Sequence, residues 1–474
     1  MIIRRFYCIL SFTIATLVCF GHSQQLGCQH PSNYSDFSLV LINQTLIVTG
    51  ANMEQLEVWT QDISNGFSTT SDCWINHASN TTLDYSPYKN GIAFQYSNTS
   101  IAVQAGDNGT PLMSTMAIFD VTTNTWSDPV ALIKGTQPVT KARMSVSLNT
   151  STNTAWFYGG RAESSATPNY YNTFYNFDIN TNTWNWPTTF YSGGYRPARY
   201  GHTSSLISDR LFILGGKTAV HSEDNSWVGA SFGDFQNVLV FDTVSHQAIT
   251  MATIGDIPPA RYSFTAVDGK TPDATSIVLF GGQNVSAETS FDATNDIYVL
   301  DTCTLNWTKP EISGIPPIAR AGHEAIVYLG RYMVVTMGIQ NFDPTTGPVY
   351  VNDSAILDMR SWTWINSIPI GPTKNKSVKS SCRFVFPVVV PDDDGGDNTT
   401  DTFNPSVVKY TNDDSRTKKL ALGLTFGCLG LLVLVTALVI FILRIRRDVD
   451  AKQNPRWIPS VLRKKKPITE STTI

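Results

Sequence analysis

Residues 30–390 lack any stretch in which apolar residues recur every 3.6 positions between helix caps. Short apolar runs separated by Gly, Asp and Asn occur instead, a pattern typical of strands joined by tight turns. Common enzyme motifs are also missing: the sequence has no Gly-x-Ser-x-Gly, no His-Glu-x-x-His and no phosphate-binding glycine loop. We therefore expect an all-β protein, and nothing in these motifs supports a hydrolase.

Long apolar runs are scarce, and the first one lies at the N-terminus. Arg4 and Arg5 precede the apolar residues 6–20, which form a run too short to span a bilayer comfortably. The small residues Gly21 and Ser23 follow, so residues 1–23 are predicted to be a signal peptide cleaved before Gln24. An uncleaved anchor is the alternative.

The second long run, residues 420–443, contains no charged residue. At about 1.5 Å per residue it would extend about 36 Å, enough to cross a hydrocarbon core of about 30 Å with some tilt. Arg444, Arg446 and Arg447 follow directly, and positive charge after a span holds that end in the cytosol. The pattern predicts a transmembrane helix in a single-pass type I membrane protein, in the plasma membrane or an endomembrane, with a basic cytoplasmic tail at 444–474.

Charge differs between the two predicted sides. The tail has nine Lys and Arg against three acidic residues, whereas the whole chain has a net charge of −4. Subtracting the charge of the tail (+6) and of the two signal arginines (+2) leaves a net charge near −12 for the mature ectodomain. An acidic exterior argues against nucleic acid or anionic lipid as its partner.

Cysteine is also sparse, with seven residues in the chain, three of them in the predicted signal peptide and span. The four others are Cys28, Cys73, Cys303 and Cys382. Spacings of 45, 230 and 79 residues contain no close ligand pair for zinc, so we expect two disulfides. The sequence does not determine which of the three possible pairings they form.

Glycosylation signals agree with this topology. Eleven Asn-x-Ser/Thr sequons lie on the predicted lumenal side, and we expect a majority to carry glycan. They are at Asn33, Asn43, Asn80, Asn98, Asn108, Asn149, Asn284, Asn306, Asn352, Asn375 and Asn398.

Residues 391–419 contain few apolar side chains and an acidic stretch, Asp392 to Asp397. Such a segment cannot bury a core, so it is predicted to be a disordered linker between ectodomain and span. A calcium-binding loop is the alternative, but the stretch lacks the spaced ligands and terminal Glu of an EF-hand loop.

Residues 24–390 carry an internal repeat. Apolar runs end in a glycine or glycine pair whose last members, residues 50, 106, 160, 216, 282 and 338, are 56, 54, 56, 66 and 56 positions apart. After each glycine most copies have a second apolar run ending in Asp (Asp120, Asp178, Asp242, Asp301 and Asp358), then a Trp. The fourth copy lacks that Trp, and the first copy has Trp74. Several copies open with an arginine, which we align as Arg143, Arg199, Arg261 and Arg320.

These motifs resemble the kelch-repeat family, including the propeller of galactose oxidase, which would suit a fungal protein, and that of attractin-type surface proteins. The matching residues are Gly159, Gly160, Gly215, Gly216, Gly281, Gly282, Trp126, Trp184, Trp307 and Trp364, with the openings Arg199–His202 and Arg320–His323. The resemblance implies a β-propeller of six four-stranded blades, with the Trp side chains filling the space between blades. Ring closure stays open: either residues 38–42 or the segment after Cys382 could complete a blade.

An enzyme of the galactose oxidase type would need a copper site. The ectodomain has His30, His77, His202, His221, His246 and His323, but His202 and His323 occupy a position that the family uses structurally. No cysteine stands in the Tyr-Thr-Cys context of that copper site, so we expect no cofactor and no catalysis, with a membrane-anchored oxidoreductase as the alternative function. The repeated Asp and Arg residues are expected to cap turns and tie blades together.

Binding is the remaining function. The longest insertions, residues 162–171, 218–235, 285–295 and 341–352, all follow the glycines and should emerge on one face of the ring. Their aromatic residues suit contacts with an extracellular protein or glycan in recognition, adhesion or cargo binding, although they could equally pack on the ring. These candidates are Tyr170, Tyr171, Trp227, Phe232, Phe235, Phe291 and Phe342.

Overall fold

A computed structural model describes most of the repeat region. The described residues are 29–31, 33–49, 57–70, 73–77, 91–106, 115–127, 133–162, 169–192, 197–221, 227–269, 276–284 and 291–368. All their regular elements are strands, β1 to β37, which confirms the all-β prediction for this part of the chain. None of these residues forms a helix able to cross a membrane. The predicted signal peptide, linker, span and tail lie outside the described ranges.

Within the described residues, six sheets of four or five strands follow one another along the chain. Sheet 1 contains β1 (Ser38–Ile42), β2 (Thr45–Thr49), β3 (Val58–Asp62) and β5 (Ile75–His77). Sheet 2 contains β6 (Ile92–Gln95), β7 (Ser100–Gln104), β8 (Met116–Asp120) and β9 (Thr125–Ser127). Sheet 3 contains β10 (Ser145–Asn149), β11 (Thr154–Tyr158), β14 (Phe174–Asp178) and β15 (Thr183–Asn185).

The next two sheets have five strands each. Sheet 4 contains β18 (Thr203–Ile207), β19 (Arg210–Leu214), β22 (Asn237–Asp242), β23 (Gln247–Ala252) and β16 (Phe190–Ser192). Sheet 5 contains β26 (Thr265–Gly269), β27 (Ser276–Phe280), β29 (Ile297–Asp301), β30 (Asn306–Thr308) and β24 (Ile254–Gly255). Sheet 6 contains β31 (Glu324–Tyr328), β32 (Tyr332–Thr336), β35 (Ser354–Asp358) and β36 (Thr363–Ile365).

The added strands β16 and β24 depart from the expected four-stranded blade. Each is part of the connection from the preceding sheet and pairs in parallel with the outermost strand of the sheet, β23 or β30. An outer strand otherwise exposes unpaired N–H and C=O groups, and the connection satisfies some of them.

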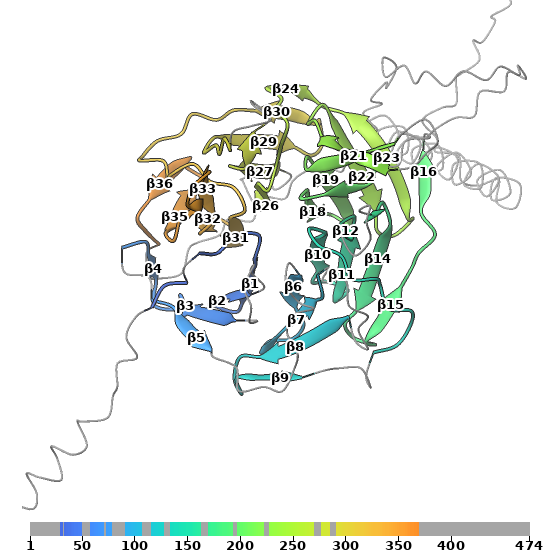
Figure 1. Cartoon of the computed structure of the whole chain (residues 1–474), viewed down its shortest axis with the longest axis horizontal. Coiled ribbons are helices and arrows are strands. Elements are labelled where there is room, and N and C mark those ends of the chain that lie inside the picture. Colours follow the sequence, from blue (N-terminus) through green and yellow to red (C-terminus); the bar gives the residue numbers. More distant parts are fainter. Residues whose placement is uncertain are drawn as a thin grey trace, which may run out of the picture. The chain divides into compact units, whose positions relative to one another are not determined.

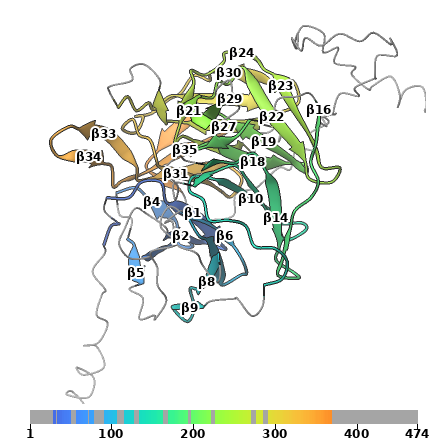
Figure 2. The same ribbon diagram turned by 45° about the vertical axis from the view of Figure 1, so that its right-hand side comes forward.

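The sheets are arranged as a ring (Figure 1; Figure 2 gives a view turned by 45°). Residues from all six sheets line a central cavity, which we call the channel. Their first strands lie innermost and touch in the cyclic order β1, β6, β10, β18, β26, β31 and again β1. Sheets 1 and 6 are each built from continuous chain and meet directly. The Asp36 N–H donates to the Gly322 carbonyl at 2.9 Å, and β4 (Phe67–Ser68) pairs with β37 (Ser367–Ile368). Residues 38–42 therefore form the inner strand of sheet 1, whereas the segment after Cys382 lies outside the described residues.

Six apolar clusters stabilise this ring, one between each pair of neighbouring sheets. Five of them contain the repeated tryptophan, which lies in the outer strand or, for Trp74, directly before it, and these side chains are at most 7% exposed. They are Trp74, Trp126, Trp184, Trp307 and Trp364. A large flat ring buries the most apolar area at such a junction, which explains the tryptophan in these copies.

The glycine pairs make the turn at the end of each second strand. Gly159 and Gly160 have φ angles of 69° and 94°, in the left-handed region. A Cβ atom on Gly159 would lie 2.4 Å from the Arg199 carbonyl oxygen and 2.7 Å from the His202 ring. Backbone and side chains of the next sheet thus approach too closely for any other residue.

Candidate binding face and central channel

A second tier of short strands covers one end of the ring. After each glycine turn the chain leaves its sheet and pairs with the segment that leads into an inner strand. The tier contains β12 (Arg161–Ala162), β13 (Asn169–Tyr170), β17 (Arg199–Tyr200), β20 (Lys217–His221), β21 (Trp227–Phe232), β25 (Arg261–Tyr262), β28 (Gln283–Asn284), β33 (Ile339–Asp343) and β34 (Gly347–Tyr350). We call this end the hairpin face; the insertions identified in the sequence contribute its strands (Figure 2).

Several candidate aromatic residues are half-buried on this face. Tyr170 stacks on Tyr200 with ring centroids 5.7 Å apart. Phe232 packs edge-on against Tyr262 at 5.5 Å. Phe342, in the β33–β34 hairpin, is 54% exposed.

The other candidates have different environments. Tyr171 lies beneath a buried lysine, Lys141, whose Nζ is 4.7 Å from the ring centroid. Phe291 is half-buried, and Trp227 lies in β21. Phe235 was wrongly assigned to the binding set, because it is 1% exposed and packs in the core.

The hairpin face surrounds the mouth of the channel. Five residues there, Asp36, Arg143, Gly201, Ser263 and Gly322, all have φ between 52° and 63°. Four of their N–H groups donate to the carbonyl of the equivalent residue in a neighbouring sheet, at 2.8 to 3.2 Å. These backbone hydrogen bonds run from sheet 3 through sheets 4, 5 and 6 to sheet 1 and fix the shape of the mouth.

This geometry corrects the alignment of the repeated arginines. Arg143 precedes its inner strand by two residues, whereas Arg199, Arg261 and Arg320 precede theirs by four. Lys141 is the true counterpart of those three. Because a lysine replaces the usual arginine at this position, the sequence alignment matched Arg143 to the three arginines instead.

The three arginines are buried and hold the glycine turns of their own sheets. The Nη1 atoms of Arg199 and Arg261 donate to the carbonyls of Gly215 and Gly281 at 2.9 and 3.1 Å. Arg320 also forms an ion pair with Asp353, with 2.7 Å between Nη2 and Oδ1. Their side chains thus stabilise single sheets and their hairpins. Their backbone carbonyls tie neighbouring sheets together, because they accept hydrogen bonds from the N–H groups of Gly160, Gly216 and Gly282 at 2.8 to 3.0 Å.

Two further cations, Arg161 and Lys217, lie beside the mouth. The Arg161 guanidinium is 4.6 Å from the Tyr200 ring centroid, and Lys217 Nζ is 4.3 Å from that of Tyr262. Burial, together with the charges of Arg143 and Arg161, lowers the pKa of Lys217. The hairpin face therefore holds two cationic side chains over tyrosine rings beside the channel mouth.

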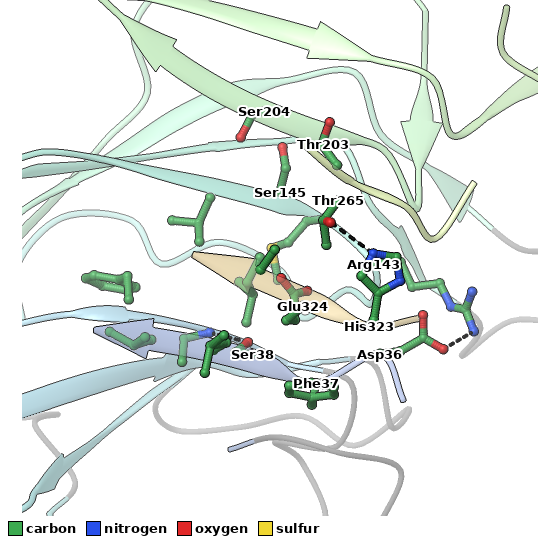
Figure 3. A pocket seen from close by; sticks show the side chains of 18 of the residues that line it. Asp36, Phe37, Ser38, Arg143, Ser145, Thr203, Ser204, Thr265, His323 and Glu324 are labelled. Atoms are coloured by element: carbon green, nitrogen blue, oxygen red, sulfur yellow. Dashed lines mark hydrogen bonds and ion pairs between the residues drawn. The ribbon is translucent and has the colours of Figure 1, made fainter. Parts of the chain in front are cut away.

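The channel itself contains a cavity of about 400 Å³, lined by residues from all six sheets (Figure 3). Its wall includes the hydroxyl groups of Ser145, Thr203 and Thr265 and, at the same position of sheet 6, the carboxyl group of Glu324. Burial, and secondarily the negative charge of Asp36, raises the pKa of Glu324 to about 8. Sequence analysis did not single out this carboxyl group, because the repeat pattern does not indicate that the position faces the channel.

The histidines next to these positions have structural roles. His202 Nε2 lies 2.8 Å from the Ser145 hydroxyl, and His323 Nε2 lies 2.9 Å from that of Thr265, so each bridges to the preceding sheet. Burial and neighbouring cations lower the pKa of both imidazoles to about 3. Within the described ranges no three His, Cys, Asp or Glu side chains are grouped to hold a metal ion.

The repeated carboxylates lie at the opposite end of the ring, between the third and fourth strands. Asp242, for example, accepts hydrogen bonds from the N–H groups of Val244 and Ser245 at 2.8 and 3.0 Å. Asp120, Asp178 and Asp301 accept equivalent pairs, and Asp358 accepts one from Arg360. They cap turns and do not converge on a catalytic site.

The predicted modification sites are only partly described. Cys73 and Cys303 are disulfide-bonded, while Cys28 and Cys382 fall outside the described residues. The sequon residues Asn33, Asn43, Asn98 and Asn352 are exposed, and Asn284 and Asn306 are half-buried. Asn149 is 7% exposed and hydrogen-bonded through both amide atoms, so the folded protein does not present it for glycosylation. Asn80, Asn108, Asn375 and Asn398 are outside the described residues.

Comparison with known proteins agrees with the ring of repeats. Residues 11–216, 91–270 and 218–387 match the KLHDC2/KLHL20/DRC7 Kelch-repeats domain, so the chain belongs to this kelch-repeat family. Kelch domain-containing protein 3 of Bos taurus is 34% identical over 176 residues, 36% of this chain and 41% of that protein. Host cell factor of Drosophila melanogaster is 24% identical over 279 residues, 57% of this chain and 17% of that protein.

The chain thus spans less than half the length of these curated relatives. The solved structure of YjhT aligns over 72% of this chain and 99% of its own, with a TM-score of 0.49 and 12% identity. The family and these relatives define the class of protein: a kelch-repeat protein-interaction module.

Proposed function

We propose that this protein is a single-pass type I membrane glycoprotein whose kelch propeller binds an extracellular or lumenal protein or glycan through the hairpin face. One observation carries the binding role. Hairpins from four neighbouring sheets gather around the channel mouth and hold aromatic and cationic side chains in half-buried positions. Such side chains are already ordered before a partner arrives, which lowers the entropic cost of binding.

The membrane part of the proposal rests on the sequence, with its apolar run at 420–443, the basic residues after it and the sequons before it. A tagged full chain expressed in cells tests it. We expect a glycosidase-sensitive mass shift and, in sealed microsomes whose cytosolic face is outward, protease digestion of the 444–474 tail with protection of the propeller. A tail protected in such microsomes, or a propeller confined to the cytosol, would contradict the topology.

The binding role is tested by crosslinking the full chain on intact cells and comparing two alanine variants. Phe342→Ala changes an exposed aromatic side chain of the hairpin face, whereas Val244→Ala changes a 74% exposed residue at the opposite end. We expect saturable partner capture that falls in Phe342→Ala and persists in Val244→Ala. Equal capture by both variants and the wild type would place binding elsewhere.

A further inference from the structure

We infer that the channel binds a primary ammonium group, from a small free amine or a lysine side chain, and that the Glu324 carboxylate is its counter-ion. The inference goes beyond the proposed function, because it assigns a ligand class to the channel and not to the hairpin face around it. Glu324 is a side chain that breaks the pattern of the inner strands.

At two junctions, the residue two positions after the mouth residue of one sheet hydrogen-bonds to a histidine of the next sheet. Ser145 of sheet 3 meets His202 of sheet 4 at 2.8 Å, and Thr265 of sheet 5 meets His323 of sheet 6 at 2.9 Å. Each of these histidines directly follows the mouth residue of its own sheet. The hydroxyl groups at these two positions therefore have partners within the ring.

Glu324 occupies the same position in sheet 6, but sheet 1 offers it no such partner. The residue that corresponds to the histidines there is Phe37, whose side chain has no hydrogen-bonding group. Among the described residues Glu324 forms no ion pair and no hydrogen bond with a side chain, and only the Ala325 N–H favours its charged form. Figure 3 shows its carboxyl group among the side chains that line the cavity.

The cavity supplies no counter-ion for this carboxyl group. Its other titratable lining residues are Asp36 and Arg143 at the mouth and His202 and His323 in the wall. Asp36 and Arg143 pair with each other, with 3.2 Å between Oδ2 and Nη2. Burial lowers the pKa of both imidazoles to about 3, so they are neutral near pH 7. A positive charge for Glu324 has to come from a ligand.

An ammonium group supplies that charge. Burial, and secondarily the charge of Asp36, raises the pKa of Glu324 to about 8, so the carboxyl group of the empty channel is largely protonated at neutral pH. An opposite charge close by favours the ionised form instead. The N–H groups of an ammonium donate charge-assisted hydrogen bonds to a carboxylate, which makes the pair specific as well as strong.

A divalent metal ion suits the cavity less well. Calcium takes roughly six to eight oxygen ligands, several of them carboxylates. Within the described ranges no three His, Cys, Asp or Glu side chains are grouped to hold a metal ion. One carboxylate matches one positive charge.

The dimensions of the channel also suit an alkylammonium. Gly322 lies at the mouth and Glu324 two residues deeper in the chain, a distance of about 7 Å along a strand. The four-carbon stem of a lysine extends over a similar depth. Leu39, Val146 and Leu148 line the same cavity and provide apolar contact for the methylene groups.

The test follows the unfolding midpoint of the full chain in detergent while a ligand is added, since a ligand that binds the folded state raises that midpoint. The ligands are butylamine and an acetylated peptide of alternating Lys and Gly. Butanol and the same peptide with Nε-acetylated lysines are the uncharged controls. We expect saturable stabilisation by the charged ligands only. Butylamine alone would identify a site for free amines, the peptide alone a site for lysine side chains, and both together a site open to either source.

Two matched variants locate the binding. Glu324→Gln keeps the size of the side chain and removes its charge, so the affinity for the charged ligands should fall about tenfold at pH 8. Glu311→Gln makes the same change at an exposed residue that does not line the cavity, and it should bind as the wild type does.

The pH dependence separates a counter-ion from a structural residue. A carboxyl group with a pKa of about 8 must lose its proton to pair with a cation, so the affinity of the wild type should rise with pH. We expect up to about tenfold per pH unit between about pH 6 and pH 7.5, levelling off above pH 8. Butylamine stays protonated over this range, and Glu324→Gln should show no such rise.

Several results would overturn the inference. These are equal binding by Glu324→Gln and wild type, an affinity of the wild type that does not change between pH 6 and 8, and stabilisation by butanol equal to that by butylamine. If no amine binds while Phe342→Ala still loses partner capture, the channel site is refuted and the proposed function stands.

Discussion

Two junctions of the ring are filled by a tryptophan from opposite sides. One lies between sheets 5 and 6, and the other lies between sheets 3 and 4. At the first, Trp364 of sheet 6 reaches back to Phe280 of sheet 5, with ring centroids 5.3 Å apart. At the second, Ala248 stands where the other copies have the tryptophan, as its pairing with Phe241 shows. Trp156 of sheet 3 fills the space from the other side, 5.3 Å from Phe241. A propeller junction thus requires the volume of an indole, and either sheet can supply it.

The largest expected effect comes from removing that indole at either junction. Trp364→Ala and Trp156→Ala should each destabilise the protein by roughly 3–5 kcal/mol, because each leaves a cavity in a closed junction. Val244→Ala, on the exposed turn of sheet 4, should leave stability unchanged. Denaturant unfolding of the full chain measures all three.

Adding a second change sharpens the comparison. Trp156→Ala combined with Ala248→Trp restores the regular arrangement and should recover part of the lost stability, whereas Ala248→Trp alone overpacks the junction. If the combined variant is no more stable than Trp156→Ala, the two arrangements are not equivalent.

The buried cations before the inner strands give the next largest effect. Arg261→Met should cost about 3 kcal/mol, since it leaves Asp296 and the Gly281 carbonyl without their buried donor. Lys141→Met should instead stabilise the protein at pH 7, because burial against aromatic rings lowers the pKa of Lys141 to about 7 and the methionine removes the cost of burying its charge. Thermal or denaturant unfolding of both variants checks the contrast, and equal losses would contradict it.

Glu324→Gln tests the inner position at which sheet 6 differs from sheets 3, 4 and 5. The pKa of Glu324 is raised to about 8 in the folded protein, above its ordinary 4.5, so its contribution to stability falls as pH rises between these values. Glu324→Gln should remove that loss and stabilise the protein at pH 8 by roughly 2 kcal/mol, less than the full pKa shift implies because the carboxyl group faces a cavity. At pH 4 the variant and wild type should unfold alike.

Lys141 gives a pH dependence in the opposite direction. Its folded-state pKa of about 7 lies below the ordinary 10.5, so the unfolded chain binds more protons between these values. The penalty for burying Lys141 is therefore complete below pH 7 and is relieved as pH rises toward 10. Comparing the unfolding midpoints of wild type and Lys141→Met from pH 7 to 9.5 isolates the contribution of Lys141 to the pH dependence of stability. If the midpoints of both proteins change equally with pH, Lys141 is more solvated than its surroundings indicate.

The repeat motifs predicted much of the fold because their causes are local. Gly159 and Gly160 mark a turn that needs positive φ, and Asp242 marks a turn whose N–H groups need an acceptor. The same reasoning placed the hairpins on one face. It failed for Arg143 and Phe235, because a shift of two residues before a strand and the burial of one loop side chain depend on neighbouring sheets.

The sequence by itself determined the strand-turn unit and the residues that recur in most copies, because these depend on contacts within one repeat. Only the tertiary structure decided which side chains meet at the mouth and in the channel. Asp36, Arg143 and Ser263 belong to three different sheets, and closing the ring is what brings them within hydrogen-bonding distance. Contacts across a closed ring are not part of the repeat pattern, so the arrangement of the channel mouth could be found only in the folded protein.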